Sequence, residues 1–151
     1  MNYKRSVILL LSFTLVPLIH AAGQASSIPQ SKLISIDNLV KMIQSGQEKP
    51  LMFQVGSRVL YQQAHIPGSE YLGPGSNEDG LKKLRERVST ISKNKTIVLY
   101  CGCCPWGHCP NVKPAFEALT STGFSDVKVL YIPDNFGTDW VDKGYPTAKG
   151  E

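Results

Sequence analysis

Hydrophobic and polar positions along the chain alternate between two periods. Short runs of apolar and β-branched residues, which are typical of strands, recur between segments with helical spacing. Two of these runs, Leu51–Val55 and Thr96–Tyr100, are apolar at almost every position, as expected for strands that are covered on both faces of a sheet. The pattern predicts strands at 33–35, 51–55, 70–72, 96–100 and 127–132.

Between these strands, apolar residues spaced three or four positions apart predict helices. Ile36, Leu39 and Ile43 form one such face, with Ser35 as a cap before it and Gly46 as a stop after it. The other helical segments are 61–64, 81–88, 114–122 and 136–142. Strands that alternate with helices indicate an α/β domain with a central, mainly parallel sheet and helices on both faces.

Composition supports a single packed domain. The 151 residues are 42% hydrophobic and 19% charged, and neither low-complexity segments nor internal repeats interrupt the pattern. The formal charge is +4, which falls to about +2 if a segment containing Lys4 and Arg5 is removed. The chain has no basic stripe, so we expect no nucleic-acid partner.

The N-terminus has the pattern of a secretory signal peptide. Lys4 and Arg5 precede an apolar run, Val7–Ile19, and small residues follow at Ala21–Ala25. We therefore expect a signal peptide at 1–25, a linker at 26–31 and the domain at 32–151. This predicts a secreted, periplasmic protein with no membrane contact after cleavage. The alternative, a retained membrane anchor, is less favoured because the run is shorter than the ~20 residues of a span.

All four cysteines lie within nine positions, directly after the predicted strand 96–100. Active sites of parallel sheets sit at the carboxyl ends of central strands. We expect Cys101, the first residue past the strand, to lie among loop N–H groups and the N-terminus of the helix from Pro114. Such a setting lowers the pKa of a thiol, so Cys101 is the predicted catalytic nucleophile. The competing interpretation is a loop held together by its cysteines.

The rest of the loop supplies candidate binding residues and leaves its cysteine chemistry open. Disulfides Cys104–Cys109 and Cys103–Cys109 are both plausible, and Cys101 with Cys104 has a redox-type spacing. The thiols and His108 are also soft or borderline metal ligands, although their spacing is tighter than that of a structural zinc site. We predict no cofactor and no metal. The candidate binding residues are Gly102, Cys103, Cys104, Trp106, Gly107, His108 and Cys109.

Four motifs lie between Lys32 and Pro146. The strand 51–55 is followed by a His-Ile-Pro-Gly-Ser turn at 65–69, and the strand 97–100 ends in a cysteine. A helix then closes on Gly123-Phe124, and Trp140, Gly144 and Pro146 follow. Together these motifs resemble those of single-domain rhodanese-like proteins, and the turn is similar to that family's HIPGA turn. The resemblance implies an α/β fold with a parallel sheet of about five strands. It also implies a cysteine, here Cys101, that carries sulfane sulfur as a persulfide.

Two departures from the family pattern bear on the substrate. Gln54-Val55-Gly56 stands where the family often has Asp-Val-Arg, and the cysteine loop has no arginine or lysine before Lys113. Arginine forks bind oxyanions such as thiosulfate or phosphate well. We therefore expect thiosulfate to be a poor sulfur donor. A phosphatase function is supported even less by this loop.

The sequence thus predicts sulfur transfer or thiol redox chemistry through Cys101, with a small sulfur donor or thiol acceptor as partner. The alternative is a non-catalytic rhodanese-like module that binds a protein partner or a soft metal through the cysteine loop. Two further residues are expected to be structural: His65 in its turn, and Trp140 in the core.

Overall fold

The computed structural model describes residues 27–45 and 49–150, and five strands in this part of the chain form one sheet. The order across the sheet is β1-β5-β4-β2-β3, and every neighbouring pair is parallel. This confirms the predicted α/β class, and it makes β4 the central strand. The strands are β1 (Leu33–Ile34), β2 (Leu51–Gln54), β3 (Glu70–Tyr71), β4 (Ile97–Tyr100) and β5 (Val127–Leu130).

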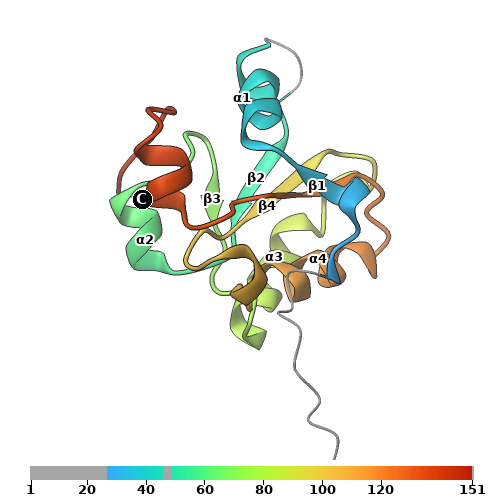
Figure 1. Ribbon diagram of the computed structural model, residues 1–151. Coiled ribbons are helices and arrows are strands. Elements are labelled where there is room, and N and C mark those ends of the chain that lie inside the picture. The colour runs from blue at the N-terminus through green and yellow to red at the C-terminus, as the bar shows by residue number, and fades with distance from the viewer. Residues whose placement is uncertain (1–26, 46–48, 151) are drawn as a thin grey trace, which may run out of the picture.

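Helices cover the sheet on both sides. Figure 1 shows α3 and α4 side by side below the sheet and α1 above it. A 3₁₀ turn, η3, lies within the cysteine loop, and the last helical segment, η4, is a π-helix. The elements are α1 (Ile36–Gln44), α2 (Arg58–Gln63), α3 (Glu78–Val88), α4 (Val112–Thr120), η2 (Gln30–Lys32), η3 (Trp106–His108) and η4 (Gly137–Val141).

The central strand contributes to two apolar clusters, one on each face of the sheet. Ile97 and Leu99 point into the cluster that α3 and α4 cover, whereas Val98 and Tyr100 point into the cluster that contains Trp140. All four strand residues are at most 1% exposed. Burial on both faces is the physical reason for the unbroken apolar run, because neither set of alternate side chains meets water.

Several boundaries differ from the predicted ones. The α4 helix begins at Val112, two residues before Pro114, because the first turn of a helix has N–H groups without intrahelical partners and tolerates a proline. The predicted turn 61–64 is the second half of α2, which starts at Arg58. Ser35 caps α1 as predicted, accepting a hydrogen bond from the Asn38 N–H at 3.3 Å.

Part of the predicted N-terminal linker packs against the domain. Ile28, within the predicted linker 26–31, is 6% exposed and packs into the core cluster beside α4. Lys32, at the end of η2, donates a hydrogen bond to the Ser125 carbonyl at 3.1 Å. The predicted signal peptide at 1–25 and the helix stop at Gly46 lie outside the described residues. None of the described helices has the length and apolar character that crossing a membrane would require.

Candidate functional site

The cysteine loop leaves the sheet at the end of its central strand. Cys101 follows β4 directly, and Gly102 then takes a positive φ of 71°. A Cβ atom at Gly102 would lie 2.6 Å from the Phe136 Cβ, so a side chain at this position would clash as well as strain the backbone. The Gly102 carbonyl accepts a hydrogen bond from the Phe136 N–H at 3.0 Å. The chain segment before η4 therefore fixes the backbone just after Cys101.

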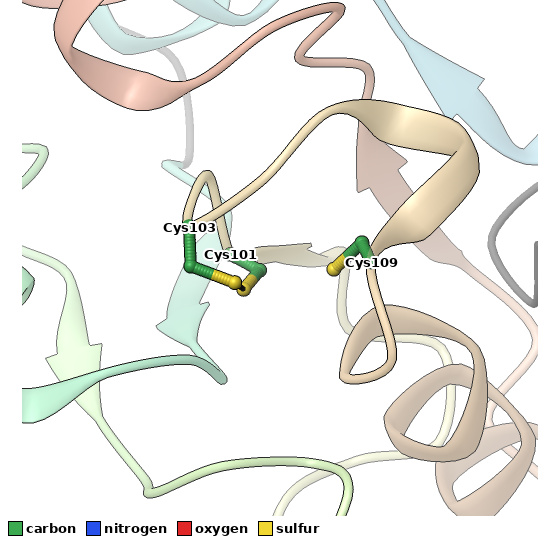
Figure 2. A group of neighbouring side chains, drawn as sticks. All are labelled: Cys101, Cys103 and Cys109. Carbon is green, nitrogen blue, oxygen red and sulfur yellow. Dashed lines mark hydrogen bonds between the residues drawn. The ribbon is translucent and has the colours of Figure 1, made fainter.

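Three of the four cysteines converge at this point. The sulfur atoms of Cys101, Cys103 and Cys109 all lie within 4.8 Å of one another, and the Sγ atoms of Cys101 and Cys103 are 3.1 Å apart. Figure 2 shows the sulfurs of Cys101 and Cys103 meeting, with Cys109 pointing toward them from the far end of the loop. Cys101 and Cys109 are each 3% exposed, whereas Cys103 is half-buried. All four cysteines are free thiols.

Cys104 and His108 stand beside this three-thiol cluster and not within it. The Cys104 Sγ lies 3.2 Å from the Cys103 Sγ, and it donates to the His108 carbonyl at 3.6 Å. The His108 side chain is exposed, and a Cβ at Gly107 would meet nothing within 4 Å. Of the predicted binding residues, Cys104, Gly107 and His108 therefore form the outer rim of the loop.

Trp106 points to another part of the molecule. Its backbone N–H donates to the Pro133 carbonyl at 2.9 Å, and its ring contacts the Tyr131 ring edge-on at a centroid distance of 5.2 Å. Together with Ile28 and Leu33, these two aromatic side chains line a surface hollow. Trp106 thus anchors the loop to the segment after β5, on the side of the N-terminal strand.

Asn111 is a site residue that the sequence analysis missed. Its Nδ2 donates to the Cys101 Sγ at 3.4 Å and to the Cys103 Sγ at 3.7 Å, and its Oδ1 accepts from the Ser76 N–H at 3.1 Å. The residue is 6% exposed. An asparagine just before a helix reads as a helix cap, but its side chain makes no capping hydrogen bond to α4. Its amide serves the thiols instead.

The wall behind Cys101 is built by residues at which the chain departs from the family pattern. A Cβ at Gly56 would lie 2.5 Å from the Cys101 Sγ, so this position has no space for a side chain. Gln54, which is 2% exposed, donates from Nε2 to the Cys101 carbonyl at 3.4 Å and accepts from the Gly56 N–H at 3.1 Å. Gln54 and Gly56 therefore hold the backbone of β2 tightly against the nucleophile position.

The electrostatics of the cluster favour the thiolate on Cys103. Hydrogen bonds donated by the Cys101 and Cys109 thiols, with a further one from Asn111, hold the pKa of Cys103 well below its usual range. The same contacts to Cys103 and Cys109, together with burial, raise the pKa of Cys101. The expectation of a lowered pKa at Cys101 is therefore wrong, because the three thiols share one negative charge and it resides on the least buried of them.

The N-terminus of α4 faces Cys109, whereas the sequence analysis expected it to face Cys101. The backbone N–H groups of Asn111 and Val112 face the Cys109 sulfur and favour its thiolate, as does the contact with Cys101. The contact with Cys103 and burial outweigh them, so the pKa of Cys109 is raised. Burial, followed by the contact with Cys103, raises the pKa of Cys104 to about 12.

The cluster has the ligand chemistry of a soft metal site as well as that of a thiol reaction centre. Three sulfurs within 4.8 Å of one another suit Cu(I) or Zn²⁺, which bind thiolates strongly. Metal binding and sulfur chemistry would use the same atoms, so the two exclude each other at this cluster.

The two residues predicted to be structural are so. The His65 Nδ1 lies 2.8 Å from the Tyr61 carbonyl oxygen, and the His65 ring stacks on the Tyr61 ring at 3.9 Å. The hydroxyl of Tyr100, on β4, accepts from the Ile66 N–H at 3.2 Å, which ties this turn to the central strand. Trp140 is 1% exposed in the core.

Solved structures with the same fold are numerous. The BH2092 protein of Bacillus halodurans superposes with a TM-score of 0.60 at 24% identity, over 79% of this chain and 77% of that chain. The Alr3790 protein of Anabaena sp. gives 0.58 at 23% identity, over 77% and 82%. An EanB variant in complex with hercynine gives 0.54 at 22% identity, over 78% of this chain but 27% of EanB. Identities this low establish the fold alone.

No curated protein matches the sequence. The family of rhodanese-like domains matches it over residues 35–131, which runs from the cap of α1 to the end of β5 and includes the whole cysteine loop. Because this match takes in well over half of the chain, the protein belongs to the rhodanese-like domain family.

Proposed function

We propose that the protein is a sulfurtransferase that carries sulfane sulfur as a persulfide on Cys101. The observation that carries this proposal is the position of Cys101. It is the first residue after the central strand of a rhodanese-like fold, and its sulfur is 3.1 Å from that of Cys103. Cys103 is a neighbour that can exchange protons and sulfur with Cys101.

The environment of Cys101 suits a stored persulfide. The residue is 3% exposed, so bulk water and reductants reach a sulfur bound there only slowly. The Asn111 Nδ2, at 3.4 Å from the Cys101 Sγ, supplies a donor to the persulfide anion. The thiolate character that a nucleophile requires comes from the shared charge of the three-thiol cluster.

The donor is a sulfane compound other than thiosulfate. Lys113, the first cationic residue after Cys101, is paired with Glu117 on α4 at 3.6 Å, so it is engaged away from the loop. Without an arginine fork, the sulfonate of thiosulfate has no bidentate partner in the loop. A thiol redox function is the second candidate, since the 3.1 Å contact of Cys101 with Cys103 is also the geometry from which a disulfide forms.

The proposal is tested by loading and transfer. Reduced protein is incubated with several sulfane donors, the donor is removed, and intact-mass analysis counts the sulfur atoms gained before cyanide is added as acceptor. We expect the parent to keep one added sulfur and Cys101→Ser to keep none, with Cys109→Ser retaining part of the load. If Cys101→Ser holds and transfers sulfur as well as the parent, Cys101 is not the carrier. If the parent gains none from any donor, the binding-module interpretation replaces this one.

We further propose that the protein acts after export, in the periplasm. The support is the sequence pattern of Lys4 and Arg5, the apolar run and the small residues up to Ala25. Intact-mass analysis of protein from the exported fraction should give a mature start near Ala22 to Ser26. A full-length chain recovered from the membrane would show that the segment is retained.

A further inference from the structure

Cys101 and Cys103 differ in how a substrate can reach them. Cys101 is 3% exposed and does not line the hollow that Cys103 lines. Cys103 is half-buried and lines a hollow of about 260 Å³ between α2 and the segment around η4. A donor in this hollow therefore meets the Cys103 sulfur before it can meet that of Cys101.

The hollow is mainly apolar and has no cationic side chain in its described lining. It is lined by Leu60, Ala64, Phe136 and Val141, with the amides of Gln63 and Asn135 beside them. Leu60 and Val141 are 37% and 38% exposed, which is unusual for large aliphatic side chains in this fold. Such a lining gains free energy by burying an apolar group, but it offers an anion no counter-charge.

We propose that Cys103 is the thiol that takes sulfur from the donor and passes it to Cys101, and that the donor is an organic persulfide with an apolar, uncharged body that lies in this hollow. The inference rests on the proposed function, to which it adds an entry residue and a substrate class. Cys103 is the more exposed of the two thiols and lines the hollow, so it is the thiol placed for the first attack.

The relay consists of two balanced exchanges. In the first, the Cys103 thiolate attacks the outer sulfur of the donor; a sulfur–sulfur bond forms to Cys103, the bond within the donor breaks, and the donor leaves as a thiolate. In the second, the Cys101 sulfur attacks the outer sulfur of the Cys103 persulfide, and Cys103 leaves with the electron pair and takes up the Cys101 proton. Neither exchange requires an external oxidant or reductant. The protein ends with one persulfide on Cys101.

Asn111 links the two positions. Its Nδ2 is 3.4 Å from the Cys101 Sγ and 3.7 Å from the Cys103 Sγ, so one amide group can stabilise negative charge on either sulfur. The Sγ–Sγ distance of 3.1 Å places the two residues close enough to exchange sulfur directly with each other.

The first test follows sulfur through the protein with benzyl persulfide, released in situ from a protected precursor, as the probe. Samples are quenched by alkylation and mapped by mass spectrometry. In the parent, added sulfur should appear on Cys103 first and on Cys101 later. In Cys101→Ser it should stop at Cys103 and pass back to the benzyl thiol that the first exchange released, so that little stays on the protein. In Cys103→Ser, the loading rate of Cys101 should fall at least tenfold.

The direction in which Cys103→Ser changes the loading rate of Cys101 distinguishes the relay from direct attack. Cys103 contributes to the raised pKa of Cys101, so removing it favours the Cys101 thiolate and by itself would speed direct attack. A slower rate therefore reports the lost route. Loading of Cys103→Ser at the parent rate would overturn the relay and leave the proposed function standing. Absence of loading in the parent would overturn the proposed function itself.

The second test addresses the hollow and keeps the relay falsifiable if Cys103→Ser folds poorly. Leu60→Asp places a carboxylate in the hollow, while the matched control Val59→Asp places it on the neighbouring residue of α2, which is 62% exposed and does not line the hollow. We expect Leu60→Asp to lower the second-order loading rate from benzyl persulfide about tenfold and Val59→Asp to leave it within twofold of the parent. Equal rates for both variants would show that the donor does not use this hollow.

Discussion

Gly56 offers a direct test of how closely the site is packed around Cys101. Its position corresponds to the family's common arginine, yet a Cβ there would lie 2.5 Å from the Cys101 Sγ and 3.1 Å from the Gln54 Nε2. Ordinary van der Waals contact begins at 3.4 Å, so Gly56→Ala forces a displacement of about 1 Å. The Cys101 sulfur has little space to yield, because Cys103 lies 3.1 Å from it.

Two magnitudes follow from this overlap. Adding a methyl group to a well-packed interior costs about 1–3 kcal/mol, so the free energy of unfolding should fall by that amount. Displacing a reacting atom by about 1 Å costs roughly 100-fold in rate, so loading of Cys101 with sulfane sulfur should slow by about that factor. The effect on the reaction should therefore exceed the effect on stability, because the overlap falls on the reacting sulfur.

Urea denaturation and sulfur loading by intact mass measure the two effects. Gly107→Ala is the stability control, since a Cβ there meets nothing within 4 Å, and it should change the free energy of unfolding by less than about 1 kcal/mol. Gly56→Ala with parental stability and a parental loading rate would refute the reasoning, because the added methyl group would then have found space that the structure does not contain.

Two further predictions concern the charge and the metal chemistry of the cluster. Asn111→Leu removes a donor to the Cys103 thiolate; a hydrogen bond to a charged group contributes about 1.5–3 kcal/mol, so the pKa of Cys103 should rise by about one unit. The pH profile of Cys103 alkylation should then move up by about one pH unit, so that below the parent pKa the variant reacts about tenfold more slowly, and an unchanged pH profile would exclude this role. A strong chelator should change the melting temperature little, because apolar clusters on both faces of the sheet hold the fold; a marked fall would indicate a metal bound at Cys101, Cys103 and Cys109.

The fold could be predicted because its signals are local and repeated. The apolar run at 96–100 is continuous since β4 is buried on both faces, and the spacing of Ala115, Phe116 and Leu119 marks the buried face of α4. Ser35 before Ile36 is a cap in both sequence and structure. Each of these patterns depends on neighbours within one element, which a single sequence contains in full.

The bounds and types of the structural elements were harder to predict where tertiary contacts outweigh the local sequence pattern. Ile28 lies in a short polar stretch and reads as part of a linker, yet it reaches the core because η2 and β1 carry it across the edge of the sheet. The segment 136–142 has helical spacing but forms a π-helix, with hydrogen bonds such as that from the Asp142 N–H to the Gly137 carbonyl. Neither outcome follows from spacing alone.

The distribution of charge within the cysteine loop is the part of the site that sequence reasoning could not reach. The position of Cys101 after the central strand follows from order along the chain, but its pKa depends on which sulfurs the loop brings within 4.8 Å. The turn at Gly102 and the contact with Asn111 turn Cys103 back onto Cys101, and the N-terminus of α4 faces Cys109 instead. A buried thiol with a raised pKa beside a half-buried thiolate is a division of roles, storage on one sulfur and attack by the other, that a single cysteine at the end of a strand cannot provide.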